Sequence, residues 1–149
     1  MICYKRSIQY YETDKMGITH HANYLHFMEE ARLFYLESIG LPFADLEAMG
    51  LASPVLQLSV DYRCPSTFGD TLEISVRLSS YHGARLCVQY EMRDAETGKL
   101  VCTAASQHCF LKDGVIYAPR RENPQLHAVL QRALAQDTAQ REAAEVPGA

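Results

Sequence analysis

Hydrophobic and polar residues follow two different spacings along this chain, and each spacing predicts a different kind of element. From Asn23 to Ile39 the apolar residues recur every three or four positions, which predicts an amphipathic helix, and Gly40 and Pro42 mark its end. The apolar arc of this helix spans roughly 200°, about twice the width typical of a helix on a protein surface. We therefore expect other elements to wrap around it. A short helix from Phe43 to Met49 follows.

After Gly50 the spacing changes to two. Apolar and polar residues alternate along three stretches, 56–63, 71–78 and 85–93, and a further apolar stretch covers Leu100 to Leu111. Alternation of this kind is typical of strands with one solvent-facing side. The pair Asp113-Gly114 predicts a hairpin turn. Another strand is expected over 2–11, followed by a loop over 12–21. Short turns between the strands predict a mostly antiparallel sheet.

The amphipathic strands need an apolar partner, and only the helix from Asn23 to Ile39 is apolar around enough of its circumference. The sequence thus predicts an α+β fold with one antiparallel sheet wrapped around one long central helix. Asn123 and Pro124 start a last helix as its cap and first turn. Because no repeat or flexible linker divides the chain, we expect a single domain over 1–136 and a disordered tail over 137–149.

Composition narrows the class of protein. The 149 residues are 48% hydrophobic and 21% charged, which is typical of one globular domain. Five cysteines without C-x-x-C spacing, and no apolar leader, predict a reduced, cytoplasmic protein. No apolar run approaches the roughly 20 residues that span a bilayer, so no membrane span is expected. Lys and Arg total 14 against 18 Asp and Glu and are scattered, which argues against a nucleic-acid partner.

The candidate chemistry lies between Asp14 and Leu25, where a carboxylate, Gly17, two adjacent histidines and a helix start fall within twelve residues. Backbone N–H groups at a helix start can stabilise a carbonyl oxygen that gains negative charge during acyl transfer. A nearby carboxylate can activate water or attack the same carbonyl. From the spacing alone, the favoured explanation is a turn aspartate, a glycine with positive φ, and histidines that are merely packed or solvated.

Other kinds of site have less support. His20, His21, His26 and Glu30 fall within eleven residues, but H-E-x-x-H and Cys/His zinc spacings are missing, so no metal site is predicted. His26 and Glu30 fit a solvated helix pair. Cys64, before a proline at a strand end, is the one cysteine considered as a nucleophile. The serine-hydrolase motif G-x-S-x-G is absent from the sequence.

The segment 10–32, Y-Y-E-T-D-K-M-G-I-T-H-H-A-N-Y-L-H-F-M-E-E-A-R, resembles the signature of the hotdog-fold acyl-CoA thioesterases. It is most similar to the branch with para-hydroxybenzoyl-CoA thioesterase and the Tol-Pal-associated acyl-CoA thioesterases. The likeness continues through P-V-L-Q-L-S-V-D-Y-R-C-P-S-T-F-G-D-T-L and weakly to about Ala118. It implies a hotdog fold and a hydrolase that cleaves acyl-CoA to free acid and coenzyme A, with no metal or organic cofactor.

The resemblance also implies roles for single residues. Asp14, rather than Glu12, is the catalytic acid, as general base or nucleophile, and the backbone N–H of His21 polarises the thioester carbonyl. Further candidates for substrate contact lie beside these two: Gly17, Ala22 and Tyr24. The basic run that holds the coenzyme A phosphates in the para-hydroxybenzoyl enzymes is replaced by Y-H-G-A-R, which leaves His82 and Arg85 as phosphate ligands.

Several alternatives stay open at this point. The family implies a homo-oligomer, at least a dimer and here a tetramer, with each active site between two subunits. A hotdog hydratase or dehydratase, and a non-catalytic acyl-CoA or acyl-carrier binding module, are the other functions considered. Aromatic residues such as Tyr24 at helical spacing occur more often in a core than in an acyl tunnel. Arg32 lies inside the apolar arc, which predicts an ion pair with a carboxylate from another segment.

Overall fold

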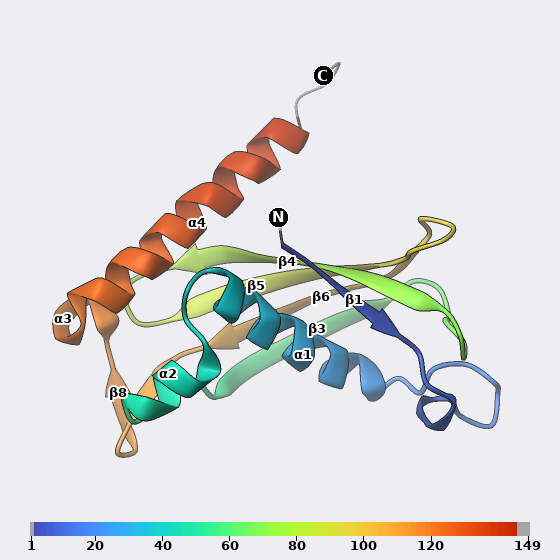
Figure 1. Ribbon diagram of the computed structural model, residues 1–149, viewed down its shortest axis with the longest axis horizontal. Helices are drawn as coiled ribbons and strands as arrows, with labels where there is room; N and C mark the ends of the chain where they lie inside the picture. Colours follow the sequence, from blue (N-terminus) through green and yellow to red (C-terminus); the bar gives the residue numbers. More distant parts are fainter. Residues whose placement is uncertain (1, 146–149) are drawn as a thin grey trace.

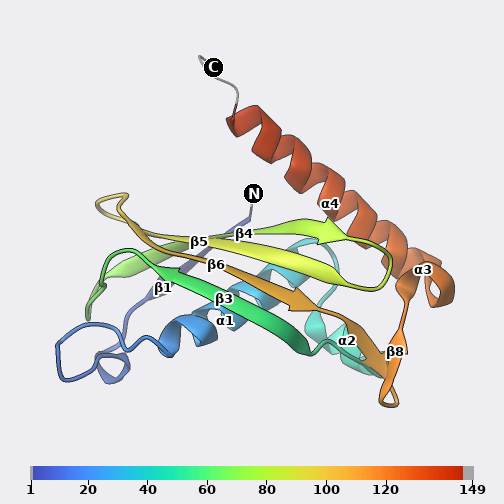
Figure 2. The ribbon, with the colours of Figure 1, turned by 180° about the vertical axis from the view of Figure 1, so that it is seen from behind.

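A five-stranded antiparallel sheet curves around helix α1 (Asn23–Ser38) in the computed structural model, which describes residues 2–145 (Figures 1 and 2). The strand order is β1-β4-β5-β6-β3. The strands are β1 (Ile2–Ser7), β4 (Thr71–Tyr81), β5 (Leu86–Asp94), β6 (Leu100–His108) and β3 (Val55–Tyr62). The predicted architecture, one antiparallel sheet wrapped around one long helix, is therefore confirmed.

The core lies between α1 and the concave face of the sheet. Alternate residues of β4 and β5 point at the helix and are buried, among them Ile74, Val76, Val88 and Met92. Seven residues of α1 are buried against them: Tyr24, Phe27, Met28, Ala31, Arg32, Tyr35 and Leu36. Leu25 and Phe34 of the predicted apolar arc stay 39% and 40% exposed. One chain alone thus covers less of the helix than the arc predicts.

Two elements differ from the predicted boundaries. The first strand ends at Ser7, and a 3-10 helix, η1 (Tyr10–Glu12), replaces its predicted end. The predicted strand from Leu100 to Leu111 is interrupted at Cys109, because the chain leaves the main sheet there. It continues as β7 (Phe110–Lys112) in a second sheet with β2 (Leu51–Ala52) and β8 (Val115–Tyr117). The expected short helix is present as α2 (Phe43–Ala48), and it precedes β2, a strand that the sequence did not predict.

The C-terminal helix is longer than the sequence indicated. After α3 (Pro119–Glu122), α4 (Pro124–Ala144) begins with the predicted cap, where the Leu126 N–H donates to Oδ1 of Asn123 at 3.1 Å. The helix continues through Ala144, so the expectation of disorder after 136 is wrong for 137–144. The physical reason is that Asp137 is buried and accepts a 2.8 Å hydrogen bond from the Leu78 N–H of β4. Residues 146–149 of the expected tail lie outside the described residues.

All five cysteines are free thiols. Within residues 2–145, no helix is both long enough and apolar enough to span a membrane.

Candidate active site

The predicted acid lies in a tight loop between η1 and α1. The backbone N–H of Asp14 donates to Ile18 O at 2.8 Å, and the Gly17 N–H donates to Asp14 O at 2.9 Å. Gly17 adopts a φ of +79°, the left-handed conformation that favours glycine, and its carbonyl accepts from the Thr67 hydroxyl. One carboxylate oxygen of Asp14 accepts a 2.8 Å hydrogen bond from Met16 N–H. The other oxygen has no donor among residues 2–145 and is free to act on a ligand.

The start of α1 lies beside this loop and offers an unused N–H group. Ala22 caps the helix without a side-chain hydrogen bond, and its own N–H donates to Nδ1 of His20 at 3.1 Å. Across the described chain no acceptor is found for the backbone N–H of His21. The carbonyl of His21 accepts a 2.9 Å hydrogen bond from the hydroxyl of Tyr62, at the end of β3. The N–H of His21 therefore lies in a segment that is fixed by two hydrogen bonds, one from the Ala22 N–H and one from the Tyr62 hydroxyl.

A cavity of about 340 Å³ brings the predicted residues together. Its lining includes Asp14, His21 and Tyr24, and also Tyr62, Arg63 and Cys64 from the end of β3 and the segment after it. A residue with a carboxylate and a residue with an unpaired N–H at a helix start thus line the same space. This is the arrangement needed to add an oxygen nucleophile to a carbonyl and to stabilise the negative charge that forms on the carbonyl oxygen.

A cluster of buried hydroxyl groups lies next to the cavity, and two of its residues, Thr19 and Tyr24, line the cavity. The Tyr24 hydroxyl lies 2.7 Å from Ser66 Oγ, which lies 2.7 Å from Thr19 Oγ1. Burial raises the pKa of Tyr24, so the phenol stays protonated. Tyr24 is only 3% exposed, which fits the core interpretation, while its ring still borders the cavity. Hydrogen bonds between Thr19 and Ser66 fasten the loop that carries Asp14 to the segment after β3.

Glu12, the other acid considered, belongs to a buried ion pair. Its carboxylate contacts the Arg6 guanidinium and accepts the Gln9 N–H at 2.8 Å, and the residue is only 4% exposed. The carbonyl of Glu12 accepts from His20 N–H at 2.8 Å and from Nδ2 of Asn23 at 2.7 Å. Glu12 therefore fixes the loop and the helix start, and its carboxylate does not open into the cavity. Spacing alone could not reveal this pair, because Arg6 comes from β1.

The structure does not bring His82 and Arg85 to the site within one chain. They lie in the turn between β4 and β5, whereas the Asp14 loop lies at the other end of the sheet, where Ile8 N–H donates to Asp70 O (Figures 1 and 2). The eleven residues of β4 separate the two ends, which corresponds to roughly 33 Å of extended strand.

A metal site and a cysteine nucleophile were the other kinds of site considered, and Cys64, the candidate cysteine, lines the Asp14 cavity. No group of three His, Cys, Asp or Glu residues that could hold a metal ion occurs in the described ranges. His26 and Glu30 form no ion pair, and Glu30 contacts Arg6 at 3.3 Å instead. Burial raises the pKa of Cys102 to about 11, so this thiol stays protonated at neutral pH.

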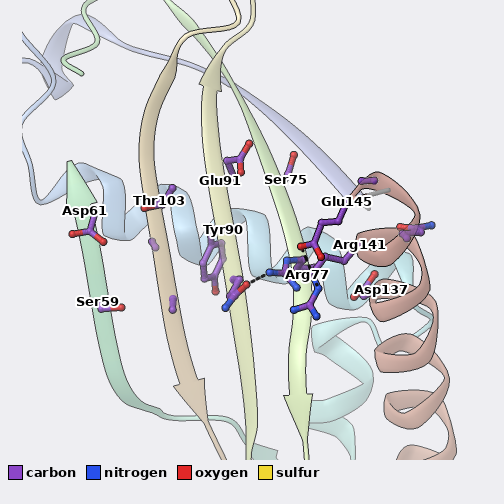
Figure 3. A pocket seen from close by; sticks show the side chains of 15 residues that line it. Ser59, Asp61, Ser75, Arg77, Tyr90, Glu91, Thr103, Asp137, Arg141 and Glu145 are labelled. Carbon is purple, nitrogen blue, oxygen red and sulfur yellow. Dashed lines mark hydrogen bonds and ion pairs between the residues drawn. The ribbon is translucent and has the colours of Figure 1, made fainter. Parts of the chain in front are cut away.

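A larger cavity, of about 450 Å³, lies on the opposite face of the sheet, beside α4 (Figure 3). Charged side chains of both signs surround it, including Arg77, Glu91, Arg141 and Glu145. The side chain of Arg77 donates to Gln89 within this face. The cavity has no carboxylate beside a free helix start, so the smaller cavity at Asp14 is the better candidate for acyl chemistry.

Comparisons with known proteins identify the family of the chain. The family model of the thioesterase-like superfamily matches residues 8–148. An Aquifex aeolicus (strain VF5) protein named as a candidate esterase is 33% identical over 119 residues, which are 80% of this chain and 91% of that protein. A Bacillus subtilis (strain 168) protein, YneP, named as a candidate acyl-CoA thioesterase, is 32% identical over 130 residues, or 85% of this chain and 92% of its own.

Solved structures show the same fold. The DHNA-CoA thioesterase of Staphylococcus aureus superposes with a TM-score of 0.86 at 28% identity, and the match covers 92% of this chain and 93% of that one. A crystal structure of an Aquifex aeolicus protein gives a TM-score of 0.80 at 31% identity, over 87% and 99% of the two chains.

Proposed function

This chain belongs to the thioesterase-like superfamily, and from that membership we propose that it hydrolyses acyl-CoA thioesters to a free acid and coenzyme A. The observation that supports the proposal is the shared cavity, which Asp14 and His21 both line. One carboxylate oxygen of Asp14 and the N–H of His21 have no partner among the described residues. The proposed reaction uses water and protein groups and needs no metal ion or organic cofactor.

The mechanism places the thioester carbonyl oxygen against the His21 N–H and its carbon near Asp14. As general base, Asp14 takes a proton from water while the water oxygen bonds to the carbonyl carbon. The C–S bond then breaks, the carbonyl re-forms, and the thiolate leaves and takes up a proton. As nucleophile, Asp14 would instead form a mixed anhydride, which water hydrolyses. In both cases the helix start stabilises the negative charge on the carbonyl oxygen.

The geometry favours hydrolysis over the hydratase alternative. A hydratase or dehydratase would need an aspartate and a histidine side chain paired against the α and β carbons of the acyl group. Here the ring of His21 stacks on that of His20 at 4.3 Å, and no histidine side chain in the described residues hydrogen bonds to Asp14. An experiment distinguishes a thioesterase from a non-catalytic binding module, because only an enzyme releases free thiol.

The acting unit that we propose is a homodimer, or a tetramer built from such dimers. Strand β3 pairs with β6 on one side and has no neighbour on the other within residues 2–145. Its side chains Val55, Leu56, Leu58 and Tyr62 are 42–51% exposed. A long apolar edge of this kind favours pairing with another strand. A second copy of β3, related by a two-fold axis perpendicular to the sheet, would extend the sheet across the edge.

This dimer also gives a role to the residues at the far end of the sheet. The two-fold axis reverses the strand direction, so the partner's β4–β5 turn comes to the end of the sheet that carries Asp14. His82 and Arg85 would then serve the active site of the other subunit and bind the coenzyme A phosphates there. Gly17 and Ala22 would contact the substrate from the loop and the helix start. The five free cysteines support our proposal of a cytoplasmic protein.

The test is a free-thiol assay with a panel of acyl-CoAs of different chain lengths and with aromatic acyl groups. We expect thiol release above the uncatalysed rate with at least one of them, and loss of that activity in Asp14→Asn. Binding of acyl-CoA without thiol release from any member of the panel would favour the binding module.

A further inference from the structure

Arg32 carries a positive charge that this chain does not neutralise. It lies on the buried side of α1 and is only 9% exposed. Nowhere in residues 2–145 does its guanidinium form an ion pair or a hydrogen bond, so the ion pair expected from the sequence is absent there. Burying a charge without a counter-charge is strongly unfavourable. The guanidinium nitrogens are not among the fully buried polar atoms that lack a partner, so a negative group from outside the described chain would stabilise Arg32 without being required for folding.

The guanidinium faces a cavity of about 220 Å³ between α1 and β3. Three polar side chains in the cavity wall already bond to one another. Ser106 Oγ lies 2.7 Å from Nε2 of His108 and 2.9 Å from the hydroxyl of Tyr90. Burial, together with the charge of Arg32, lowers the pKa of His108 to about 4, so its imidazole is neutral at pH 7. None of these three groups supplies the missing negative charge.

The other titratable groups at this cavity are His26 and Glu29, both exposed on α1. Glu29 lies three residues before Arg32, on the same side of the helix, and it too forms no ion pair in the described chain. One helix face therefore presents an unpaired negative and an unpaired positive side chain, one helical turn apart. A free anionic ligand would meet repulsion from Glu29, which favours a partner that brings charges of both signs.

The position of the cavity identifies that partner. Val55 and Leu58 of β3 line it, so it lies along the first half of the strand whose outer edge is open, and Leu58 is next to the strand's midpoint. In the proposed dimer the two-fold axis passes through the middle of this edge, and the two α1 helices run antiparallel on either side of it. Antiparallel copies of one helix face place each Glu29 toward the other copy's Arg32, because a two-fold contact is reciprocal. From this we infer that Glu29 and Arg32 form two reciprocal ion pairs across the axis of a homodimer.

This inference rests on the dimer in the proposed function, and charge exchange between subunits tests it. Glu29→Arg makes all four charges at the axis positive, and Arg32→Glu makes all four negative. We expect each variant alone to dissociate, with a dimer dissociation constant raised at least about a hundredfold. When the two are mixed in equal amounts, both pairs form again in the heterodimer. Light scattering should then show the dimer mass for the mixture and the monomer mass for each variant by itself. Thiol release should be restored in the mixture.

Controls keep the result specific. Glu37→Arg reverses an exposed charge on α1 outside the cavity and should leave the dimer mass unchanged. If Arg32→Glu fails to fold alone, the two variants are co-expressed with different affinity tags, and recovery of the tagged heterodimer is the readout. Glu29→Gln should weaken the dimer less than Glu29→Arg, because it removes attraction without adding repulsion.

Four outcomes would overturn the inference. Each variant remaining dimeric alone, or a mixture that stays monomeric while the parent chain is dimeric, excludes the reciprocal pairs. A dimeric Arg32→Glu that loses activity only on acyl groups ending in a carboxylate assigns Arg32 to substrate binding instead. A monomeric parent chain that still releases thiol rejects the proposed dimer and leaves the thioesterase activity standing.

Discussion

The hydroxyl of Tyr62 donates a 2.9 Å hydrogen bond to the carbonyl oxygen of His21, which joins the end of β3 to the start of α1. The bond fixes the residue whose N–H we propose to stabilise the carbonyl oxygen of the substrate. We predict that Tyr62→Phe lowers kcat about five- to tenfold with little change in KM, since one hydrogen bond contributes about 1 kcal/mol. Steady-state kinetics with the best acyl-CoA measure this. A parental kcat, or a change in KM alone, would contradict it.

Asp14→Asn tests the acid itself. Removing a positioned base or nucleophile typically lowers the rate about 10²- to 10⁴-fold, so we expect kcat to fall at least about a hundredfold while Tm and oligomeric mass stay near the parental values. Asp113→Asn is the matched control, because it makes the same chemical change in an exposed turn whose φ of 52° asparagine also accepts. Near-parental turnover by Asp14→Asn would show that the acid is misassigned.

Glu12→Gln should damage stability rather than chemistry. The change leaves the largely buried Arg6 without one of its counter-charges, so we expect the free energy of unfolding to fall by about 3 kcal/mol, measured by urea denaturation. A double-mutant cycle with Arg6→Leu should show strong coupling between the two residues. Additive effects of the two substitutions would mean that the ion pair contributes nothing of its own.

His108 should make the protein sensitive to mild acid. Its pKa is lowered to about 4 in the folded chain, chiefly by burial, while the unfolded value is about 6.5. Between these pH values the unfolded state binds more protons, so stability falls as the pH falls from about 6.5 to 4, by up to about 3 kcal/mol. Urea denaturation at pH 7 and pH 5 measures the loss. His108→Gln should show a smaller difference between the two pH values than the parent.

Arg85→Ala should raise KM for acyl-CoA with little change in kcat, since phosphate contacts are similar in the ground state and the transition state. A truncated pantetheine thioester without those phosphates should not distinguish the variant from the parent.

The same residue tests which subunit supplies the contact. In a heterodimer of Asp14→Asn and Arg85→Ala, one of the two sites combines an intact Asp14 with an intact Arg85 from the other chain. Mixing the two variants should therefore restore turnover with the parental KM. If turnover returns only with the raised KM, Arg85 acts within its own chain or not at all.

Most of the fold follows from local patterns. The helix over 23–38 and the strands β3, β4 and β5 follow from periodicity, because each buries one face against the same core. The interruption at Cys109 and the full length of α4 do not follow from it. Both depend on contacts between segments distant in the sequence, such as the 102 positions between Tyr35 and Asp137.

The candidate site likewise combines residues that are close in the sequence with residues that are distant in it. Asp14, Gly17 and the helix start at His21 fall within one short segment, so their proximity follows from the sequence together with the family resemblance. Tyr62 and Ser66 come from β3 and the segment after it, 41 and 42 positions away from their partners. No local spacing relates residues so far apart. Whether Arg85 belongs to the site depends on a second chain, which one sequence does not display.

Asp137 limits how far this chain can be shortened. Its Oδ2 accepts from the Tyr35 hydroxyl at 2.5 Å and from the Leu78 N–H at 2.8 Å, so one carboxylate serves α1, β4 and α4. A truncation after residue 136, where the sequence alone would end the domain, removes the Asp137 carboxylate. The Tyr35 hydroxyl and the Leu78 N–H then lose their buried hydrogen-bond acceptor. A truncation after Ala144 keeps that acceptor, and a truncation one residue before Asp137 is expected to yield a markedly less stable protein.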